Sequence, residues 1–307
     1  MVYKYKLSVV LITYNHEKFI IESLNSILRQ KLNVSWELII AEDGSTDRTR
    51  DLIVNHLYDK DIEWKINSNK DNRGIPRNFA DGILSASGEY IALMSGDDFF
   101  LGEYTLNSLL SKLDTKKACQ YVMYCGNCIE WDSTVGNLSV LYKGSTPIEL
   151  DRRDFYFQNP ITGLVLFRNI IRSFPEIFYK GRAEDRQFWM MLASKGKIKI
   201  NPFLIGRVYR RHDNSFTKSD KTNRIEGLKN RIESNLIWGK FFNDLDQPFF
   251  QRAQDLYRKK LIIELFKSKK FNRVFSEHKL LFETDHDDQF LSLKSRLLFK
   301  ALKFLSF

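Results

Sequence analysis

The sequence predicts an α/β fold, with a mixed, mostly parallel sheet flanked by helices and a helical C-terminal region. Short β-branched runs alternate with helix-periodic stretches through the first half of the chain, as they do in parallel α/β sheets. Acidic residues follow two of these runs directly, where such sheets place their ligand-binding side chains. After residue 221 almost all of the chain has helical periodicity. We therefore expect one domain over residues 1–215 and a second, helical region over 216–307.

The first two strands are expected at residues 7–13 and 37–41, where apolar and β-branched side chains follow one another. A helix through Leu24, Ile27 and Leu28 separates them. The loop after the second strand has the sequence EDGSTD, so Ser45 or Thr46 is expected to cap a helix that continues to Leu57.

Two further strands are expected at residues 62–67 and 89–94. The helix between them opens with RGIP at residues 73–76, where proline suits the first turn, and ends near residues 85–88. The carboxyl ends of parallel strands share one edge of a sheet, so Thr13, Asp43 and the pair Asp97–Asp98 should meet in one crevice. The pattern becomes mixed from residue 148 to residue 210.

Charge is distributed unevenly along the chain. The 48 basic and 38 acidic residues give a net charge of +10. Residues 209–307 hold 21 basic and 13 acidic residues, which accounts for +8 of this excess. This excess gives the last third of the chain a positive electrostatic field, which would attract nucleic acid, anionic lipid or a phosphate-bearing substrate. Nucleic acid ranks last, because no helix-turn-helix, zinc-finger or RNA-binding signature accompanies the charge.

The segment 293–305 repeats apolar residues at helical spacing, and lysine and arginine fill much of the rest. This pattern is typical of a helix on an anionic membrane surface, and equally of a helix docked on its own domain. No apolar stretch approaches the roughly 18 residues that span a bilayer. The first residues lack a signal-peptide cleavage site. We therefore expect a cytoplasmic protein that can bind peripherally to the inner face of the membrane.

The three cysteines, Cys119, Cys125 and Cys128, are too few for a disulfide framework in a chain of 307 residues. The last two form a Cys-x-x-Cys, but within a strand-like run at 121–131, where positions i and i+3 face opposite sides. Buried or half-buried thiols are therefore expected, with neither a redox motif nor a zinc site. The Gly-x-Gly-x-x-Gly and P-loop patterns are absent, so dinucleotide-dependent enzymes and P-loop NTPases fit poorly.

Five stretches of the chain carry a family resemblance. They are residues 9–15 (VVLITYN), 39–47 (IIAEDGSTD), 86–91 (ASGEYI), 95–98 (SGDD) and 184–185 (ED). In this order and spacing they resemble the family 2 glycosyltransferases of the GT-A fold that build bacterial surface polysaccharides. The resemblance covers residues 7 to about 212. It implies an inverting, metal-dependent enzyme that moves a sugar from a nucleoside diphosphate donor, expected to be a UDP-sugar, to a glycan or polyprenyl-linked acceptor.

On the donor side, Asp98 is expected to hold Mn²⁺ or Mg²⁺, because these hard cations prefer carboxylate oxygens and neutralise a departing diphosphate. The resemblance implies that Asp97 contacts the ribose, and that many relatives carry another acid in place of Ser95. It also implies that Asp43 accepts a hydrogen bond from the base or ribose. The pocket would further include Thr13, Tyr14, Asn15 and Arg73. For Arg73, a solvated loop charge is the alternative.

On the acceptor side, an inverting transfer needs a base for the proton of the attacking hydroxyl. The resemblance assigns this role to Asp185, with Glu184 as its supporting neighbour; the alternative is an ordinary helix start with well-placed acids. Trp189 is either a sugar platform or a core residue.

The segment 209–212 (YRRH) lies near the position where related enzymes bind phosphate or metal. Arg210 or Arg211 is therefore expected to contact the diphosphate, and His212 to bind Mn²⁺ unless it is an ordinary surface or core histidine.

Two other functional classes fit less well. A nucleotidyltransferase would carry a Gly-rich, Arg-containing loop after the first strand, and residues 13–16 contain none. A catalytically silent module that binds nucleotide sugars would have lost acids, whereas Asp43, Asp97, Asp98 and Asp185 are all retained.

Overall fold

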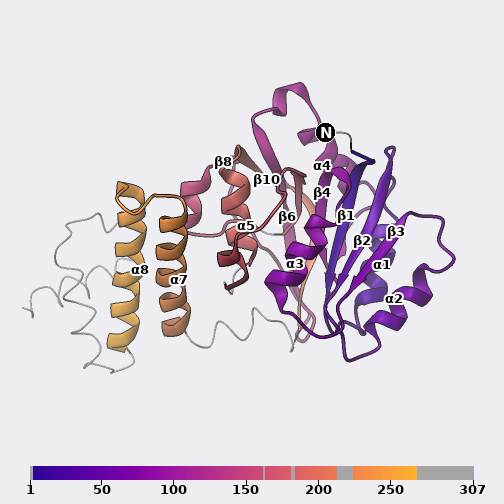
Figure 1. The fold of residues 1–307 in the computed structure, drawn as a ribbon, viewed down its shortest axis with the longest axis horizontal. Helices are drawn as coiled ribbons and strands as arrows, with labels where there is room; N and C mark the ends of the chain where they lie inside the picture. The colour runs from indigo at the N-terminus through magenta and orange to yellow at the C-terminus, as the bar shows by residue number, and fades with distance from the viewer. Residues whose placement is uncertain (1–2, 162, 181–183, 213–223, 268–307) are drawn as a thin grey trace, which may run out of the picture. The chain divides into compact units, whose positions relative to one another are not determined.

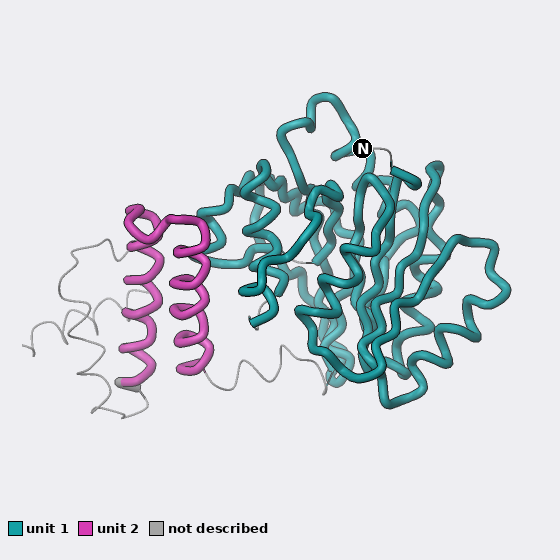
Figure 2. The backbone as a smooth tube through the Cα atoms, in the orientation of Figure 1, with its two compact units in different colours: residues 1–212 teal, residues 213–307 magenta. Residues whose placement is uncertain are grey.

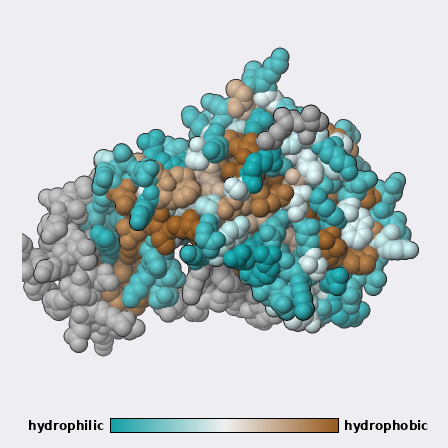
Figure 3. All heavy atoms as spheres, viewed as in Figure 1, coloured by the Kyte–Doolittle hydropathy of each residue, from teal (hydrophilic) through white to brown (hydrophobic). Residues whose placement is uncertain are grey.

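A computed structural model describes residues 3–161, 163–180, 184–212 and 224–267. The chain divides into two compact units, residues 1–212 and residues 213–307 (Figure 2). Unit 1 contains the sheet and unit 2 contains two described helices. On the visible face of unit 1, hydrophilic side chains cover most of the surface and apolar patches are separate from one another (Figure 3).

Strands and helices alternate strictly through the first part of unit 1 (Figure 1). The elements are β1 (Tyr5–Thr13), α1 (Ile20–Leu28), β2 (Trp36–Glu42), α2 (Thr49–Leu57), β3 (Trp64–Ser68), α3 (Ile75–Leu84) and β4 (Gly88–Ser95). This is the order that the sequence predicts.

The rest of unit 1 mixes short strands with turns. The elements are β5 (Phe99–Phe100), α4 (Thr105–Leu113), β6 (Tyr121–Asp132), β7 (Asn137–Val140), β8 (Ile148–Leu150), β9 (Val165–Arg168), α5 (Glu184–Ala193) and β10 (Lys197–Arg211). Short 3₁₀ helices lie at Lys116–Ala118, Arg152–Tyr156 and Glu176–Lys180.

The strands form one mixed sheet in the order β3-β2-β1-β4-β9-β6-β10-β5, with β7 on β6 and β8 on β10. Strands β1 to β4 are mutually parallel, β6 and β10 are also parallel, and β9 joins the two halves in antiparallel pairing. Thr13 is in register with Glu42, and Ile12 with Ser95, so the residues that follow β1, β2 and β4 emerge at one edge. This confirms the predicted fold class.

Helices cover both faces of the sheet, and the strands between them are therefore apolar on both sides. On one face, α1, α2 and α4 pack against Leu7, Val9 and Leu11 of β1. On the other face, α3 approaches so closely that a Cβ on Gly82 would lie 2.9 Å from Val10 Cγ1. The sheet is thus a rigid support for the loops at its edge.

The start of α2 differs from the prediction. The helix begins at Thr49, and neither Ser45 nor Thr46 caps it. Ser45 Oγ accepts a hydrogen bond from the Asn15 N–H at 3.0 Å, and the Thr46 N–H donates to Asn15 Oδ1 at 2.8 Å. Ser45 and Thr46 therefore connect the β2–α2 loop to the β1–α1 loop. At the start of the helix, Asp47 Oδ1 accepts a hydrogen bond from the Thr49 N–H at 2.9 Å.

The thiols follow the sequence prediction. Cys125 and Cys128 are free and fully buried in β6, whereas Cys119 is free and exposed. Burial raises the pKa of the Cys125 thiol well above its ordinary value, which favours the unreactive protonated form.

Unit 2 contains a pair of helices, α7 (Arg224–Phe241) and α8 (Pro248–Lys267). The side chains of Leu261, Ile262 and Leu265 pack on Ile225, Leu228 and Ile232. The segment 293–305, expected to form an amphipathic helix, lies outside the described residues. Among the helices that the structure describes, none is long and apolar enough to cross a membrane.

Candidate active site

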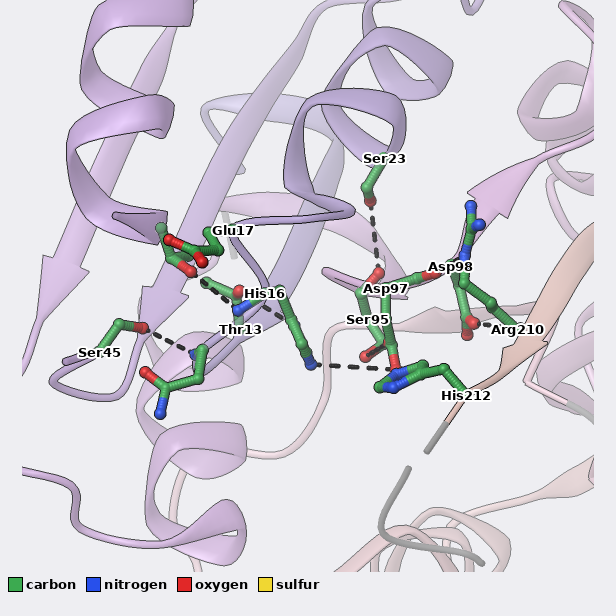
Figure 4. Close-up of polar contacts among 12 residues, drawn as sticks. Thr13, His16, Glu17, Ser23, Ser45, Ser95, Asp97, Asp98, Arg210 and His212 are labelled. Carbon is green, nitrogen blue, oxygen red and sulfur yellow. Dashed lines mark hydrogen bonds and ion pairs between the residues drawn. The ribbon is translucent and has the colours of Figure 1, made fainter. Parts of the chain in front are cut away.

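The candidate site lies at the edge of the sheet where β1 and β4 end, beside the last residues of β10 (Figure 4). Thr13 ends β1, and Asp97 and Asp98 follow β4 directly. The Gly96 N–H donates to the Ile12 carbonyl at 2.9 Å, which fixes the turn that carries both aspartates. Parallel pairing of β1 and β4 thus brings together side chains that are more than eighty positions apart.

Two histidines face one oxygen of Asp97. Its Oδ2 lies 3.2 Å from His212 Nε2 and 3.9 Å from His16 Nε2. Its Oδ1 accepts a hydrogen bond from the Ser95 hydroxyl. Burial alone would raise the pKa of Asp97, but the His212 hydrogen bond, then His16 and Ser95, outweigh burial and hold this pKa well below its usual range. Asp97 is therefore an ionised carboxylate at neutral pH.

His16 is a part of this site that sequence reasoning left without a role. Its Nδ1 lies 3.1 Å from Thr13 Oγ1, and its backbone N–H donates to Thr49 Oγ1 at 2.8 Å. Burial lowers the pKa of His16 more strongly than the Asp97 charge raises it, which favours a neutral imidazole. A Cβ on Gly96 would lie 2.6 Å from Thr13 Oγ1, so only glycine lets this turn approach.

Asp98 has a different environment from its neighbour. Its Oδ2 accepts from the Arg207 guanidinium, with Nε at 3.1 Å, and its Oδ1 accepts from the Arg210 backbone N–H at 2.8 Å. Burial raises the pKa of Asp98 to about 6, against the lowering effect of Arg207, so the carboxylate is ionised at neutral pH. Both carboxylate oxygens of Asp98, the predicted metal ligand, therefore accept hydrogen bonds from residues of β10.

Arg207 is a second residue that sequence reasoning missed. Besides pairing with Asp98, its Nη1 donates to the carbonyl of Gly163 at 2.5 Å and to that of Leu93 at 3.4 Å. Burial would lower the pKa of Arg207, but the Asp98 carboxylate outweighs burial and raises it. Gly163 has a φ of +97°, a backbone conformation that favours glycine, and a Cβ there would lie 3.1 Å from the guanidinium.

The side chain of Arg210 is enclosed by aromatic rings. The guanidinium carbon lies 4.7 Å from the Trp131 ring centroid, 4.9 Å from that of Phe19 and 5.4 Å from that of Phe99. Its Nε donates to the Asp97 carbonyl at 2.9 Å, and its Nη2 pairs with Glu22. Only 6% of this side chain is exposed, so its guanidinium is buried among these rings and its ion pair with Glu22.

The remaining residues of the YRRH segment are placed as follows. Arg211 pairs with Glu130 at 2.9 Å and is more exposed than Arg210. The His212 ring packs on Phe19, with centroids 4.6 Å apart, which holds its Nε2 toward Asp97. His212 therefore joins the site that contains Asp97.

Asp43, at the end of β2, is buried and organises the loop before α3. It accepts hydrogen bonds from Asn69 Nδ2 and from the backbone N–H groups of Arg73 and Gly74, each at 2.9 Å. The Arg73 guanidinium extends along α3 and pairs with Asp81 at 2.7 Å. The Asp43 carboxylate thus fixes the loop before α3 by binding the backbone N–H groups of that loop.

Tyr14 and Asn15 continue from β1 into the same loop region. Tyr14 is 37% exposed, and Asn15 has a φ of 54°. The Asn15 side chain is engaged with Thr46, so it fastens the loop between β2 and α2.

Asp185 and Glu184 stand in the first turn of α5. Asp185 Oδ2 accepts from Asn159 Nδ2 at 2.7 Å, and its Oδ1 accepts from the Arg186 backbone N–H at 2.6 Å. Burial, followed by the Asp185 charge, raises the pKa of Glu184 to about 8, so Glu184 carries a proton at neutral pH. Trp189 is buried against Phe167, with ring centroids 6.1 Å apart, and belongs to the core.

The fold has solved structural neighbours. The Staphylococcus aureus TarS fragment 1–349 in complex with UDP superposes with a TM-score of 0.57 at 20% identity, covering 85% of this chain and 72% of that one. The mannosyltransferase PcManGT from Pyrobaculum calidifontis, in complex with GDP-Man and Mn²⁺, superposes with a TM-score of 0.59 at 15% identity, covering 99% of this chain and 81% of that one. The fold is that of the GT-A glycosyltransferases.

Sequence comparison then identifies the family. The model of glycosyl transferase family 2 matches residues 8–171, and the chain belongs to this family. The resemblance found in the sequence is therefore confirmed.

Relatives differ in how much of their length they share with this chain. The GalNAc(5)-diNAcBac-PP-undecaprenol beta-1,3-glucosyltransferase of Campylobacter jejuni is 26% identical over 236 residues, covering 72% of this chain and 70% of that protein. A poly(ribitol-phosphate) beta-N-acetylglucosaminyltransferase, TarS of S. aureus, is 31% identical over 111 residues, 36% of this chain and 19% of that one. An uncharacterized protein of Mycobacterium tuberculosis is 34% identical over 108 residues, and this match spans only 31% of its length.

Proposed function

We propose that this chain is an inverting, metal-dependent glycosyltransferase that uses a nucleoside diphosphate sugar, with UDP as the first choice of nucleotide. Its acceptor would be lipid-linked or polymeric, in cell-surface glycan synthesis. The names of the C. jejuni and S. aureus relatives support glycosyl transfer to such acceptors, and the TarS complex with UDP supports the choice of nucleotide. The observation that carries the proposal is the pairing of Asp97 with His212 where β4 and β10 end, 3.2 Å apart and beside the neutral His16.

The metal is proposed to bind Asp97 and His212. Ligands in adjacent positions on Mg²⁺ or Mn²⁺ are about 3 Å apart when each bond is about 2.1 Å, and Asp97 Oδ2 and His212 Nε2 fit this spacing. Asp98 is a poorer candidate, because Arg207 and Arg210 engage both of its oxygens. The described residues contain no group of three His, Cys, Asp or Glu side chains suited to a metal. Substrate oxygens would complete the coordination.

A divalent cation, when bound, neutralises charge on the departing diphosphate. The protein's own contribution is to hold Asp97 fixed: the Ser95 hydroxyl donates to its Oδ1, and Nε of the ring-enclosed Arg210 donates to its backbone carbonyl. His212 would bind the metal through a deprotonated Nε2, so its contact with Asp97 Oδ2 belongs to the metal-free site. We assign Arg210 this supporting role in place of a phosphate contact, and leave Arg211 as the segment's candidate phosphate ligand.

Asp185 is proposed as the base that accepts the proton of the attacking hydroxyl. A base must be ionised before it can act, and Glu184 beside it holds a proton because burial raises its pKa to about 8. A protonated Glu184 adds no second negative charge beside the Asp185 carboxylate. This is the arrangement that an inverting transfer needs.

The nucleotide is proposed to bind along the loops after β1 and β2, lined by Thr13, Tyr14 and Asn15. Asp43 fixes the neighbouring loop by accepting from the Arg73 and Gly74 N–H groups, and keeps lone-pair capacity for a base or ribose donor. The basic excess of residues 209–307 supports association with the inner face of an anionic membrane, where a polyprenyl-linked acceptor would lie.

The test is release of nucleoside diphosphate from UDP-glucose, UDP-N-acetylglucosamine, GDP-mannose and dTDP-glucose, each with Mn²⁺, Mg²⁺ or EDTA. We expect slow hydrolysis of one donor that requires metal and is lost in Asp97→Asn. Lys112→Ala, at an exposed lysine in the last turn of α4, serves as the control. Release from none, with donor-dependent thermal stabilisation, would identify a silent binding module, and the lack of both would refute the proposal.

A further inference from the structure

The carboxylate of Asp185 is held on both sides. Asn159 Nδ2 donates to Oδ2 at 2.7 Å, and the Arg186 N–H donates to Oδ1 at 2.6 Å. The second bond comes from the adjacent backbone and is available at any helix start. The first comes from a side chain 26 positions earlier in the chain, so it needs a specific residue there.

The orientation of the Asn159 amide is itself determined. Its Oδ1 accepts from the Ile161 N–H at 3.3 Å, so the NH₂ group is the one that faces Asp185. A second link fixes the segment before it: the buried Arg186 guanidinium donates to the Phe155 carbonyl at 3.0 Å. Phe155 and Tyr156 are fully buried, which anchors the short 3₁₀ helix at 152–156. Asn159 therefore extends from a rigid support.

We propose that Asn159 is a positioning residue for Asp185. Its amide donates to one oxygen of the carboxylate, which fixes the rotation of this group and favours its ionised form over the protonated one. The nearby Glu184 makes this bond important, because two acids in one helical turn compete for a proton. The Asn159 amide contacts the Asp185 carboxylate, and no described hydrogen bond joins it to Glu184, so it acts on one of the two acids. This inference rests on the proposed role of Asp185 as the base.

The first measurement is independent of the donor and acceptor. Protein labelled with ¹³C at the aspartate carboxyl carbons is titrated by NMR, and the Asp185 signal is assigned by its loss in Asp185→Asn. In Asn159→Ala we expect the titration midpoint of Asp185 to move up by about one pH unit. In Asn159→Asp, which keeps the shape but removes the donor, we expect a larger upward shift. Asn107→Ala, at a half-buried asparagine on α4 that donates to the Lys31 carbonyl, is the matched control and leaves the midpoint unchanged.

The second measurement is turnover with the donor selected by the release assay. Asn159→Ala should lower kcat about tenfold to a hundredfold at pH 7, keep KM for the donor within about twofold, and move the acid limb of the pH–rate profile upward. Asn159→Asp would place a second carboxylate against Asp185, so we expect it to lose more activity than the alanine variant. The upward shift of the acid limb in Asn159→Ala is the readout that a merely structural asparagine would not give.

The outcomes separate this inference from the proposed function. An unchanged Asp185 midpoint and unchanged kcat in Asn159→Ala would overturn the inference, even where Asp185→Asn is inactive. A shifted midpoint together with an active Asp185→Asn would show that Asn159 orients the carboxylate but that Asp185 is not the base. That second result would refute the proposed function at this residue.

Discussion

The two acidic centres of unit 1 differ in how firmly the fold holds them. At the end of β4, Asp98 is buried, and Arg207 and the Arg210 backbone occupy both of its oxygens. At the start of α5, Asp185 is half-buried and accepts one bond from Asn159 and one from its own helix. The first centre is part of the structural core, whereas the second, which contains the proposed base, is less buried. Substitutions at the two centres should therefore separate stability from activity.

The largest effect on folding is expected where the buried pair is broken. Asp98→Asn leaves Arg207 charged and buried, so we expect the free energy of unfolding to fall by about 3–5 kcal/mol. Urea unfolding measures this directly. Adding Arg207→Met to the same chain should restore part of the loss, because the uncompensated charge is then gone. The exposed pair Arg153–Asp151 is the control, and Arg153→Ala should cost less than about 1 kcal/mol. An equal cost at both pairs would remove the distinction between a structural centre and the centre that contains the proposed base.

The largest effect on catalysis alone is expected at Asp185. Asp185→Asn keeps the size of the side chain and removes the base, so kcat should fall by about 10² to 10⁴. Donor affinity and the unfolding midpoint should stay close to wild type, because the residue is half-buried at a helix start. Steady-state kinetics measures the loss of kcat, and urea unfolding of the same variant measures any loss of stability. A large loss of stability with this variant would place Asp185 in the same structural class as Asp98.

Much of the fold was predictable because it depends on local patterns. The order of β1 to β4 and of the helices between them follows from periodicity, and parallel pairing then brings Thr13, Asp43 and Asp97 to one edge. The start of α2 was predicted wrongly, because Asn15 from another loop occupies Ser45 and Thr46. Local helix propensity cannot predict this contact, because it joins two loops that are distant in the sequence.

The partners within the site were less predictable, because they depend on the pairing of distant strands. Arg207 meets Asp98 across 109 positions, and His212 meets Asp97 across 115. From the sequence alone, an arginine on a strand is as compatible with a solvated side chain as with a buried ion pair. The pairing of β10 with β5 places Arg207 opposite Phe100, two residues after Asp98. The His in YRRH was recognisable as a candidate ligand, whereas Asn159 has no sequence pattern that marks its partner.

A moderate effect on metal binding is expected at the end of β4, where Asp97 and His212 are the proposed ligands. His212→Ala should weaken the Mn²⁺-dependent part of the thermal stabilisation given by UDP, by about tenfold in apparent affinity, because it removes one of two proposed protein ligands. Differential scanning fluorimetry with UDP and Mn²⁺, against UDP and EDTA, isolates that part. His56→Ala, at a half-buried histidine on α2 that contacts Asn25, is the matched control. Unchanged Mn²⁺ dependence in His212→Ala would return Asp98 to consideration as the ligand.

The smallest expected effect concerns Glu184 and the pH dependence of stability. Burial and the Asp185 charge raise the pKa of Glu184 from 4.5 to about 8, so folding favours its protonated form. Its stabilising contribution is therefore complete below pH 4.5 and is lost as the pH rises through 8. Glu184→Gln cannot ionise, so at pH 8.5 it should be more stable than wild type, and near pH 4.5 the two should be nearly equal. Urea unfolding at both pH values tests this. A variant that is less stable at pH 8.5 would mean that the ionised Glu184 has a cationic partner, and the centre that contains the proposed base would then be as fully paired as Asp98.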